Sequence, residues 1–511
     1  MTAAPPSDPQ GAAMGSAPVI TVSRVLDAEP VARLSDYEAI GGGAGLRAAV
    51  DQGADATLAV LDASGLRGRG GGGFPTATKW RSIIEHRPAD ISATVVVNAA
   101  EGEPGSFKDR TILRTNPFRV LEGALIAAVT IGADEVVVAT KEAFTTEVAR
   151  VREAIGAINA AGWAPEISIG LTLGPEAYLF GEETALLEVV AGRLPFPRLT
   201  PPWRRGLDED HGDGASSADA ELATPGGSAA ADGPALVNNV ETLAHVAQIM
   251  ARGPEWFREH GTEKSPGTIV CTITGRTARA GVAEVAMGTP LRSAIEAIGG
   301  GPRHGQVIAV MSGVANRLLS GDQLGTPLTY EDMTAAGSGL GTAGFMVFDE
   351  AVDPVAVAHG ASRFLAVESC GQCTPCKGDG GNIADSLDRL RSNTGRGDEQ
   401  ETVETALGTV EVGARCFLAT QHQQVVSSVM DLFPEAFAGH ADGTVDAVPP
   451  LFITEMIDIV DGDDGGGRVV YDERHRSKQP DWTFGAEDSG QSPADRLDQR
   501  SDPDSSSDHG R

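Results

Sequence analysis

The run ATVVVNAAEGEPGSFKDR, from Ala93 to Arg110, joins a short apolar segment to a polar turn. Its first part, ending at Asn98, has the length and the β-branched content of a buried strand. The polar part that follows contains Glu101 and Glu103 among several turn-forming residues. Open α/β sheets bind their ligands at the carboxyl ends of strands. The run therefore predicts a buried strand with a candidate ligand site at its carboxyl end.

Strand and helix signals alternate around this run. Further short buried strands are expected at 135–139 and 166–171, and helices at 117–131, which opens with a proline, and around 148–158, where apolar residues recur at helical spacing. Such alternation is typical of a layered α/β domain with a mostly parallel sheet. We expect this domain to cover residues 35–250.

The pattern changes twice in the second half of the chain. Residues 266–350 show short strands separated by Gly and Pro turns, with one helix around 291–298, which predicts a small β-rich module. Residues 354–440 are mostly helical, with loops that hold cysteines. Three units are therefore expected in succession.

Other segments lack the apolar residues that a folded core needs. We expect residues 1–34 to be a flexible leader, 208–233 a disordered insertion, and 441–511 a C-terminal extension that is disordered from about residue 485. The formal net charge of -31 argues against a nucleic-acid partner. No apolar stretch reaches the length of a membrane helix, so no direct membrane insertion is expected.

Four of the five cysteines are concentrated in one region of the chain. Three share the C-x2-C-x2-C spacing of ESCGQCTPCK and one follows in GARCF: Cys370, Cys373, Cys376 and Cys416. This spacing favours a [4Fe-4S] cluster over structural zinc, which usually takes two separated C-x2-C pairs. A disulfide framework is disfavoured, because no secretory signal precedes a chain of this length. Cys271 lies in an alternating apolar run and is expected in a buried strand.

The segment GLRGRGGGGFPTATKW, from Gly65 to Trp80, holds six glycines in nine residues. Such a loop lets backbone amides approach phosphate oxygens or a flat ring closely. It follows no strand and lacks the Lys-Ser/Thr pair of a P-loop, so a glycine-rich turn without a ligand is the alternative.

Two further segments place polar residues at helix entrances. One precedes the apolar helical run after Tyr178, and the other opens the helix after Val237. Their residues are Gly181, Glu182 and Glu183 in the first, and Asn238, Asn239, Glu241 and Thr242 in the second. The carboxylates and amides either contact a ligand or only cap their helices.

Taken in order, GLRGRGGGGFPT, NAAEGEPGSFKDR, FGEETALLE, NNVETL and ESCGQCTPC resemble the flavoprotein component of respiratory complex I, the NADH-quinone oxidoreductase F family. The resemblance covers roughly residues 40–435. It implies a Rossmann-like FMN and NADH domain, then a β-grasp module of the SLBB kind, then an α-helical bundle that carries one [4Fe-4S] cluster.

The resemblance also implies site residues. Those expected to hold FMN are Gly68, Arg69, Gly70, Gly71, Lys79, Asn98, Glu101, Gly181, Glu182, Asn238, Asn239 and Thr242. Those expected beside the nucleotide are Phe74, Glu103, Glu183 and Trp203, with the two aromatic side chains stacking on adenine. Glu101 and Glu183 are the expected catalytic carboxylates.

The implied activity is that of an NADH dehydrogenase subunit, with hydride transfer from NADH or NADPH to FMN and then single electrons to the cluster. The implied partners are a thioredoxin-like [2Fe-2S] subunit and a larger redox complex, in the cytoplasm or held at a membrane by those partners. Three positions depart from the family pattern: Ala100 replaces an aspartate, Ser82 an aromatic residue and Thr200 a lysine. These departures favour a divergent paralogue, and they leave two alternatives: a non-catalytic electron-relay or assembly subunit, and a zinc-stabilised binding module.

Overall fold

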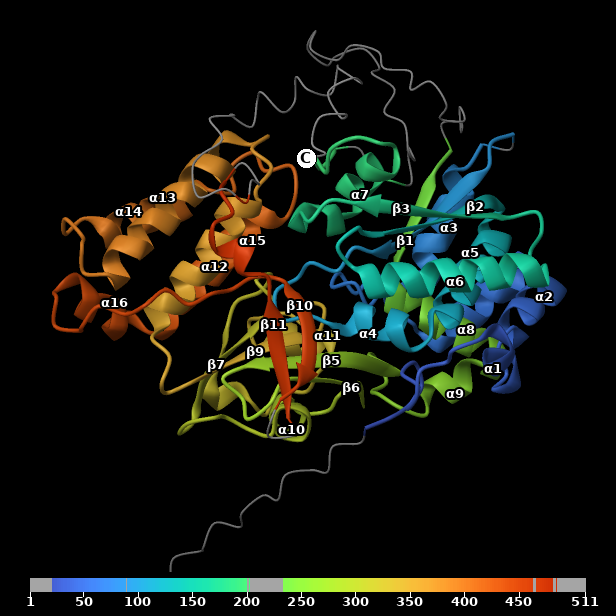
Figure 1. The fold of residues 1–511 in the computed structure, drawn as a ribbon, viewed down its shortest axis with the longest axis horizontal. Coiled ribbons are helices and arrows are strands. Elements are labelled where there is room, and N and C mark those ends of the chain that lie inside the picture. The colour runs from blue at the N-terminus through green and yellow to red at the C-terminus, as the bar shows by residue number, and fades with distance from the viewer. Residues whose placement is uncertain are drawn as a thin grey trace, which may run out of the picture.

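The computed structural model describes residues 21–88, 90–199, 202, 233–462, 466–480 and 484 (Figure 1). The predicted parallel sheet is confirmed. Its strands are β1 (Ala93–Ala99), β2 (Ala133–Lys141), β3 (Ser168–Gly174) and β4 (Ala235–Asn239), in the order β3-β2-β1-β4 with every neighbouring pair parallel. The strand of the opening run therefore lies inside the sheet.

Both faces of this sheet are covered, as its continuous apolar strands require. Val95 and Val97 point into a core shared with α2 (Ala44–Ser64), α3 (Thr76–His86), α4 (Lys108–Thr115), α5 (Pro117–Ile131), α6 (Thr145–Ala161) and α8 (Val240–Arg252). Val96 points the other way, toward α7 (Glu183–Val190). The helices predicted at 117–131 and around 148–158 are confirmed as α5 and α6.

The β-rich segment forms a second sheet. It contains β5 (Thr268–Gly275), β6 (Gly281–Ala286), β7 (Val307–Ser312), β8 (Leu319–Ser320) and β9 (Gly344–Asp349), ordered β6-β5-β9-β7-β8. Only β5 and β9 pair in parallel, and the other pairs are antiparallel. The helix expected around 291–298 is present as α10 (Leu291–Ala294) continued by the wider turn η2 (Ile295–Gly299). Cys271 is fully buried in β5, as expected.

The helical region follows and packs on the sheets. Its helices are α12 (Pro354–Glu368), α13 (Thr374–Arg391), α14 (Glu399–Leu407), α15 (Leu418–Leu432) and α16 (Pro434–Ala441). Their apolar core includes Met311 and Met346 from the second sheet and Leu179 from the short helix η1 (Tyr178–Gly181). The cysteine-bearing helices therefore share a core with residues of the other two regions.

The expectation of a flexible leader is wrong for residues 21–33. The backbone amides of Arg24, Val25 and Leu26 all donate to the Glu284 carboxylate on β6 at 2.8–3.0 Å, and Val25 is buried. The chain then enters α1 (Leu34–Ala39). A buried carboxylate that needs hydrogen-bond donors fixes this segment, which composition alone does not reveal. The disordered insertion expected at 208–233 lies outside the described residues except for Gly233.

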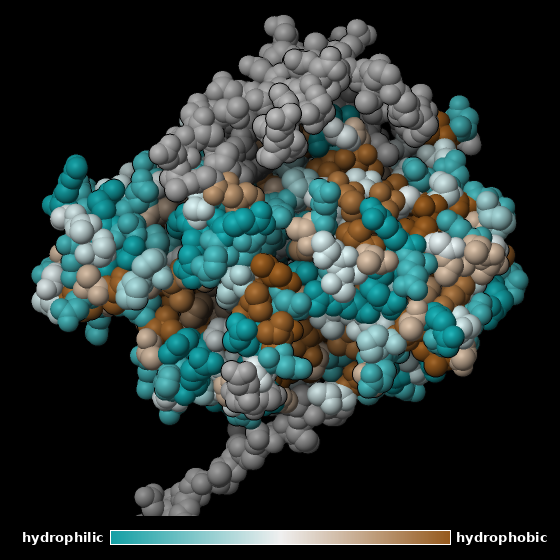
Figure 2. Space-filling model, viewed as in Figure 1, coloured by the Kyte–Doolittle hydropathy of each residue, from teal (hydrophilic) through white to brown (hydrophobic). Residues whose placement is uncertain are grey.

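The C-terminal extension contains an ordered part. After α16 the chain forms an antiparallel hairpin of β10 (Met456–Asp461) and β11 (Gly467–Tyr471), followed by the short helix η4 (Glu473–Arg476). The hairpin crosses the front of the molecule between the helical region and the sheets (Figure 1). Hydrophobic surface surrounds this crossing (Figure 2), where Ile457 of β10 is 42% exposed. The predicted disorder from about residue 485 concerns residues outside those described.

Among the described residues, no helix is both long enough and apolar enough to span a membrane. The remaining short helices are α9 (Pro254–Arg258), η3 (Gly321–Gln323) and α11 (Tyr330–Ala335).

Candidate functional site

The glycine-rich loop connects α2 to α3 and lies against the start of α8. The amide of Gly68 donates to the carbonyl of Phe74 at 2.8 Å, which closes the loop, and the amide of Arg69 donates to Oγ1 of Thr242 at 2.8 Å. Gly73 has φ +59°, and a Cβ there would lie 2.5 Å from the Tyr330 ring. A glycine is therefore required at this position by both backbone conformation and space.

Arg69 holds the loop with its side chain. The buried guanidinium donates to the carbonyls of Thr268 at 3.2 Å and Pro266 at 3.1 Å, and to the hydroxyl of Tyr330 at 3.2 Å. That hydroxyl in turn donates to the carbonyl of Gly68 at 2.7 Å. Since these donors are engaged with the second sheet, Arg69 fixes the loop and leaves ligand contact to the backbone.

The carboxyl ends of β1 and β4 lie side by side under this loop. Asn98 pairs in register with Asn239, and Val97 with Asn238. Asn98 donates from Nδ2 to the carbonyl of Gly181 at 2.8 Å, and Asn238 accepts from the Trp80 indole at 2.8 Å. The four segments singled out from the sequence thus meet at one edge of the sheet, where open α/β sheets bind ligands.

Glu101 caps a helix. Its carboxylate accepts from the amides of Lys108, Asp109 and Arg110 at 3.0–3.3 Å and from the hydroxyl of Ser106 at 2.6 Å. These are the free N–H groups at the start of α4, where a negative charge is favourable. The geometry gives Glu101 a positioning role in the loop between β1 and α4.

A buried charge cluster lies beside this cap, and the sequence reasoning did not find it. Lys108 is fully buried and contacts Asp109 at 2.8 Å, Glu241 at 2.9 Å and the amide oxygen of Asn239 at 3.2 Å. Burial tends to lower the pKa of Lys108, but Asp109 and Glu241 outweigh it and raise that pKa. Burial raises the pKa of the Asp109 carboxyl, and Glu101 adds to the effect against the ammonium group. Burial also acts to raise the pKa of Glu241, yet Lys108 holds it down at about 2.

The two glutamates before α7 have different surroundings. Glu182 accepts from the amides of Thr184 at 3.0 Å and Ala185 at 2.8 Å, so it is the N-cap of the helix, and burial raises its pKa. Glu183 forms a partly exposed ion pair with Lys79 at 2.5 Å. Lys79 and Glu183 therefore stand together at the rim of the site. Phe74, at the end of the glycine loop, is 55% exposed, and Trp203 lies outside the described residues.

Glu103 is buried at the junction of all three regions. Its carboxylate accepts from the hydroxyl of Tyr178 and from the amide of Val314, each at 2.6 Å. Burial raises the pKa of Glu103 to about 7, although both hydrogen bonds favour the ionised form. The Tyr178 hydroxyl also contacts Gln421 of α15 at 3.1–3.3 Å. Tyr178 was not predicted as a site residue, and its place at the start of the YLFG segment was the only signal for it.

All four expected metal-ligating cysteines line one cavity, together with Leu179, Pro197, Arg415 and several small residues. Gln372 bridges the cysteine loop to the segment before the insertion, since its Nε2 donates to the Pro197 carbonyl at 3.1 Å and contacts Sγ of Cys370 at 3.4 Å. Burial raises the pKa of Cys376 and of Cys416 to about 12, and neighbouring cysteines add to that shift. Thiolates in such a place require a bound cation, and four converging thiolates fit an iron-sulfur cluster.

Comparison with known proteins matches two family regions. Residues 61–248 match the Nuo51 FMN-binding domain, and residues 356–440 match the NADH-ubiquinone oxidoreductase-F iron-sulfur binding region. The first spans the glycine loop and the ends of β1 and β4, and the second contains all four cysteines of the cavity.

Whole-chain relatives agree. NADH-quinone oxidoreductase F 2 of Rhizobium meliloti is 32% identical over 80% of this chain and 94% of its own length. NADH-quinone oxidoreductase F of Streptomyces coelicolor is 33% identical over 84% of this chain and 92% of its own, and its counterpart in Rickettsia typhi is 35% identical over 73% and 86%.

Among solved structures, a chain of the NAD+-reducing [NiFe]-hydrogenase in its H2-reduced state superposes with a TM-score of 0.68. It is 31% identical, and the match covers 80% of this chain and 67% of that one. The two share the mixed α/β fold with a parallel sheet and a helical C-terminal region. Because both family regions occur in the expected order and the similarity extends over nearly the whole length of its relatives, the chain belongs to the NADH-quinone oxidoreductase F family.

Proposed function

We propose that this chain oxidises NADH or NADPH, passes the electrons through FMN to a [4Fe-4S] cluster, and delivers them to a partner redox protein. The position of the short helix η1 carries the proposal. Its last residue, Gly181, accepts a hydrogen bond from Asn98 at the flavin edge of the sheet, and its second, Leu179, lines the cysteine cavity. One helical turn thus separates the two cofactor sites.

The residues at the sheet edge fit a flavin mononucleotide. FMN supplies the conversion of a two-electron hydride donor into single electrons. Backbone amides of Gly70 and Gly71 hold its phosphate or ring, since their loop is kept open by Arg69 and Thr242. The remaining proposed flavin contacts come from Gly68, Lys79, Asn98, Gly181, Glu182, Asn238 and Asn239. Glu101 acts indirectly by fixing the loop after β1.

The nucleotide contacts are proposed at the outer side of the same edge. The exposed ring of Phe74 offers an apolar face to adenine, as Trp203 does in the segment beyond Pro202. Glu103 and Glu183 stand on either side as hydrogen-bond acceptors for ribose or nicotinamide groups. Glu183, paired with Lys79 at the rim, is the carboxylate that substrate entry displaces.

The domain boundaries follow the three cores. We assign residues 35–250 to a Rossmann-like FMN and NADH domain, 266–350 to an SLBB-like β-grasp module, 354–440 to the cluster domain and 441–511 to the extension. The β-grasp assignment is supported by a five-stranded mixed sheet with one helix packed on it and an apolar core of its own around Ile273, Leu291 and Phe345.

The proposed partner is a thioredoxin-like [2Fe-2S] subunit within a larger redox complex, located in the cytoplasm or attached to a membrane through that complex. Phe417, directly after the ligand Cys416, is 57% exposed, and Val412 in the same loop is 59% exposed. Apolar side chains exposed beside a cluster ligand offer a docking surface for an electron acceptor.

One observation favours a relay protein without hydride chemistry. Ala100 stands where the family pattern has an aspartate, and it is buried in the apolar cluster with Val96 and Phe180. A carboxylate is therefore absent from that side of the flavin edge, which lowers the number of polar groups available to the nucleotide.

A visible spectrum of the anaerobically purified, reconstituted protein decides between the two functions. We expect flavin and iron-sulfur absorption that is bleached by NADH, with NADPH tested in parallel. Bound FMN that neither nucleotide reduces, beside a cluster that dithionite still reduces, would establish the relay instead. A colourless protein that binds zinc would exclude both.

A further inference from the structure

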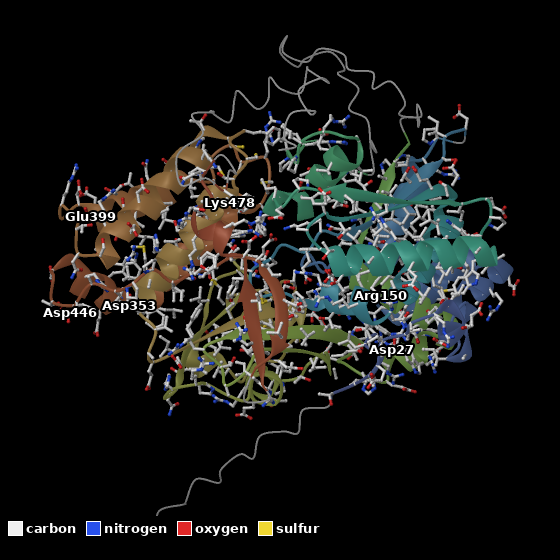
Figure 3. All side chains as sticks on the ribbon, viewed as in Figure 1. Asp27, Arg150, Asp353, Glu399, Asp446 and Lys478 are labelled. Atoms are coloured by element: carbon white, nitrogen blue, oxygen red, sulfur yellow. The ribbon has the colours of Figure 1, made fainter. Side chains whose placement is uncertain are left out.

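The C-terminal extension contacts every other part of the fold. Its described residues 450–462 and 466–480, called the clamp here, follow the matched iron-sulfur region, which ends at residue 440. Lys478, near the end of the clamp, lies between the helical region and the parallel-sheet region (Figure 3). The clamp therefore occupies the position from which relative motion of the cofactor sites is controlled.

Ion pairs fix the first part of the clamp to the parallel-sheet region. Glu455 pairs with Lys141, a buried residue at the end of β2. Arg114 of α4 contacts Asp458 at 2.6 Å, and Arg110 of the same helix donates to the carbonyl of Met456 at 2.9 Å. The hairpin also reaches the second sheet, where the amide of Ala280 donates to the carbonyl of Gly467 at 2.7 Å.

The last part of the clamp binds the helix that leads to the cysteines. Lys478 is 2% exposed, and its ammonium group contacts Glu368 at 2.6 Å and the carbonyl of Glu176 at 2.8 Å. Glu368 ends α12, two residues before Cys370. A buried ion pair of this kind fixes geometry, because either charge left alone in the interior is strongly unfavourable.

Glu368 passes this constraint on toward the flavin edge. Its second carboxylate oxygen accepts from the amide of Tyr178 at 2.9 Å, and Tyr178 opens η1, the turn shared by both cofactor sites. The hydroxyl of Tyr178 then donates to Glu103. A continuous line of hydrogen bonds therefore runs from the clamp to the proposed nucleotide side.

The clamp also meets the far end of the cysteine loop. Lys377, directly after Cys376, donates to the carbonyl of Pro480 in the clamp and to the carbonyl of Ser369 at 2.7 Å. Both ends of the ligand loop are thus tied to the clamp, one through Glu368 and one through Lys377.

We propose that the clamp sets the separation between the FMN and cluster sites, with Lys478 as the positioning residue for electron transfer between them. This inference rests on the proposed function and assigns a role to the extension, which lies beyond the matched regions. Lys478 touches neither cofactor site and acts through Glu368 and Tyr178. Transfer over a fixed separation depends on that geometry, whereas hydride transfer at the flavin edge does not.

The test compares Lys478→Met with wild type in the full-length, reconstituted protein. FMN is reduced either by NADH or by light with a sacrificial donor, and the reduction of the cluster is followed by absorbance and electron paramagnetic resonance. We expect cluster reduction to slow by about tenfold or more, as displacement by a fraction of an ångström produces in positioned reactions, while FMN reduction by NADH changes by less than about twofold. Lys264→Met, the same change at an exposed position, should leave both rates unaltered.

A second readout does not depend on activity. Amide hydrogen exchange at Tyr178 and in the loop 369–377 should accelerate in Lys478→Met, with or without cofactors, because the Glu368 carboxylate loses its fixed position. Lys478→Arg keeps the charge and should restore both slow exchange and most of the transfer rate. A uniform loss of stability without change in these local probes would contradict a positioning role.

Two results would overturn the proposal: equal slowing of flavin and cluster reduction, or no slowing of either. If Lys478→Met does not fold, Asp458→Asn removes one ion pair at the other end of the clamp and should slow only cluster reduction, by a smaller factor. Failure of NADH to reduce FMN in wild type would refute the proposed function alone, since light-driven reduction still tests the clamp.

Discussion

Tyr178 donates a hydrogen bond of 2.6 Å to Glu103, and this contact joins three regions of the fold. Glu103 follows β1 of the parallel sheet and accepts a second bond from Val314 near the end of β7, while Tyr178 also contacts Gln421 of the helical region. A carboxyl group with a pKa of about 7 is therefore placed where flavin, nucleotide and cluster sites meet.

Glu103 should make stability depend on pH. Its pKa is about 7 in the folded chain against an ordinary value of 4.5, so the folded state holds a proton that the unfolded state releases between those pH values. Stability contributed by this proton is complete below pH 4.5 and is lost as pH rises through 7, by about 3 kcal/mol. Urea unfolding at pH 5 and pH 8 should show this loss in wild type and in the exposed control Glu263→Gln, and a much smaller one in Glu103→Gln. An unchanged slope in Glu103→Gln would assign the titration to another group.

The glycine loop offers a matched pair of substitutions. Gly73→Ala places a methyl group 2.5 Å from the Tyr330 ring at a positive φ, whereas Gly72→Ala meets no atom within 4 Å. We expect Gly73→Ala to destabilise the chain without cofactor by ~1–3 kcal/mol, and Gly72→Ala to leave it unchanged. Thermal unfolding of the flavin-free protein measures the first effect. Flavin fluorescence then reports binding, which Gly72→Ala should weaken if the open side of the loop receives FMN.

Removing one cluster ligand should separate the two cofactors. Cys373→Ser removes one of the four thiols that line the cavity, so iron content and broad visible absorption should fall while bound flavin remains. Cys271→Ala changes a buried cysteine of β5 outside the cavity and should keep the iron. Loss of flavin together with iron in Cys373→Ser would show that the two sites fold as one.

Lys108 should be among the most sensitive positions in the chain. Lys108→Met leaves Asp109 and Glu241 buried without their ammonium partner, which should cost about 3–5 kcal/mol of unfolding free energy. Denaturant unfolding measures the loss, with the exposed Lys264→Met as control. Adding Glu241→Gln should recover part of the stability, because it removes one uncompensated charge; equal effects of the single and double variants would exclude that coupling.

Phe417 tests the proposed docking surface. Phe417→Asp places a charge on an exposed apolar side chain next to Cys416 and should slow electron transfer to a thioredoxin-like [2Fe-2S] partner by about tenfold, through weaker association. NADH oxidation with ferricyanide, which needs no docking, should be unaffected. Ile40→Asp, a similar change at a 50% exposed residue of the parallel-sheet region, serves as control. Unchanged transfer to the partner in Phe417→Asp would move the surface elsewhere.

The strands of the parallel sheet were predictable because both of their faces are buried. Val95, Val96 and Val97 are all fully buried, so the apolar run itself marks the strand. The helix Pro117–Ile131 was predicted to the residue, since proline marks its start and Gly132 its end. The boundaries of β2 and β3 differed from the expected ones by two or three residues at the ends, where strand pairing rather than composition decides.

The roles of the acidic residues could not be read in this way. Glu101, Glu103, Glu182 and Glu183 occur in similar polar turns, yet two cap helices, one pairs with Lys79 and one is buried against Tyr178. The partner in each case depends on which segments the fold brings together. The same holds for Glu284, which fixes the N-terminal segment, and for Lys478, which lies in a region expected only to be an extension.

The order of the amino acids was enough to specify what depends on neighbours along the chain: the buried strands, the glycine loop and the spacing of three cysteines around one centre. The folded chain was needed to show that Cys416 joins them in one cavity, that η1 separates the two cofactor sites, and that residues 450–480 tie these sites together. The physical reason is that apolar burial and short-range spacing are encoded locally, whereas an ion pair or hydrogen bond is specified only when the fold places its two partners within about 3 Å of each other.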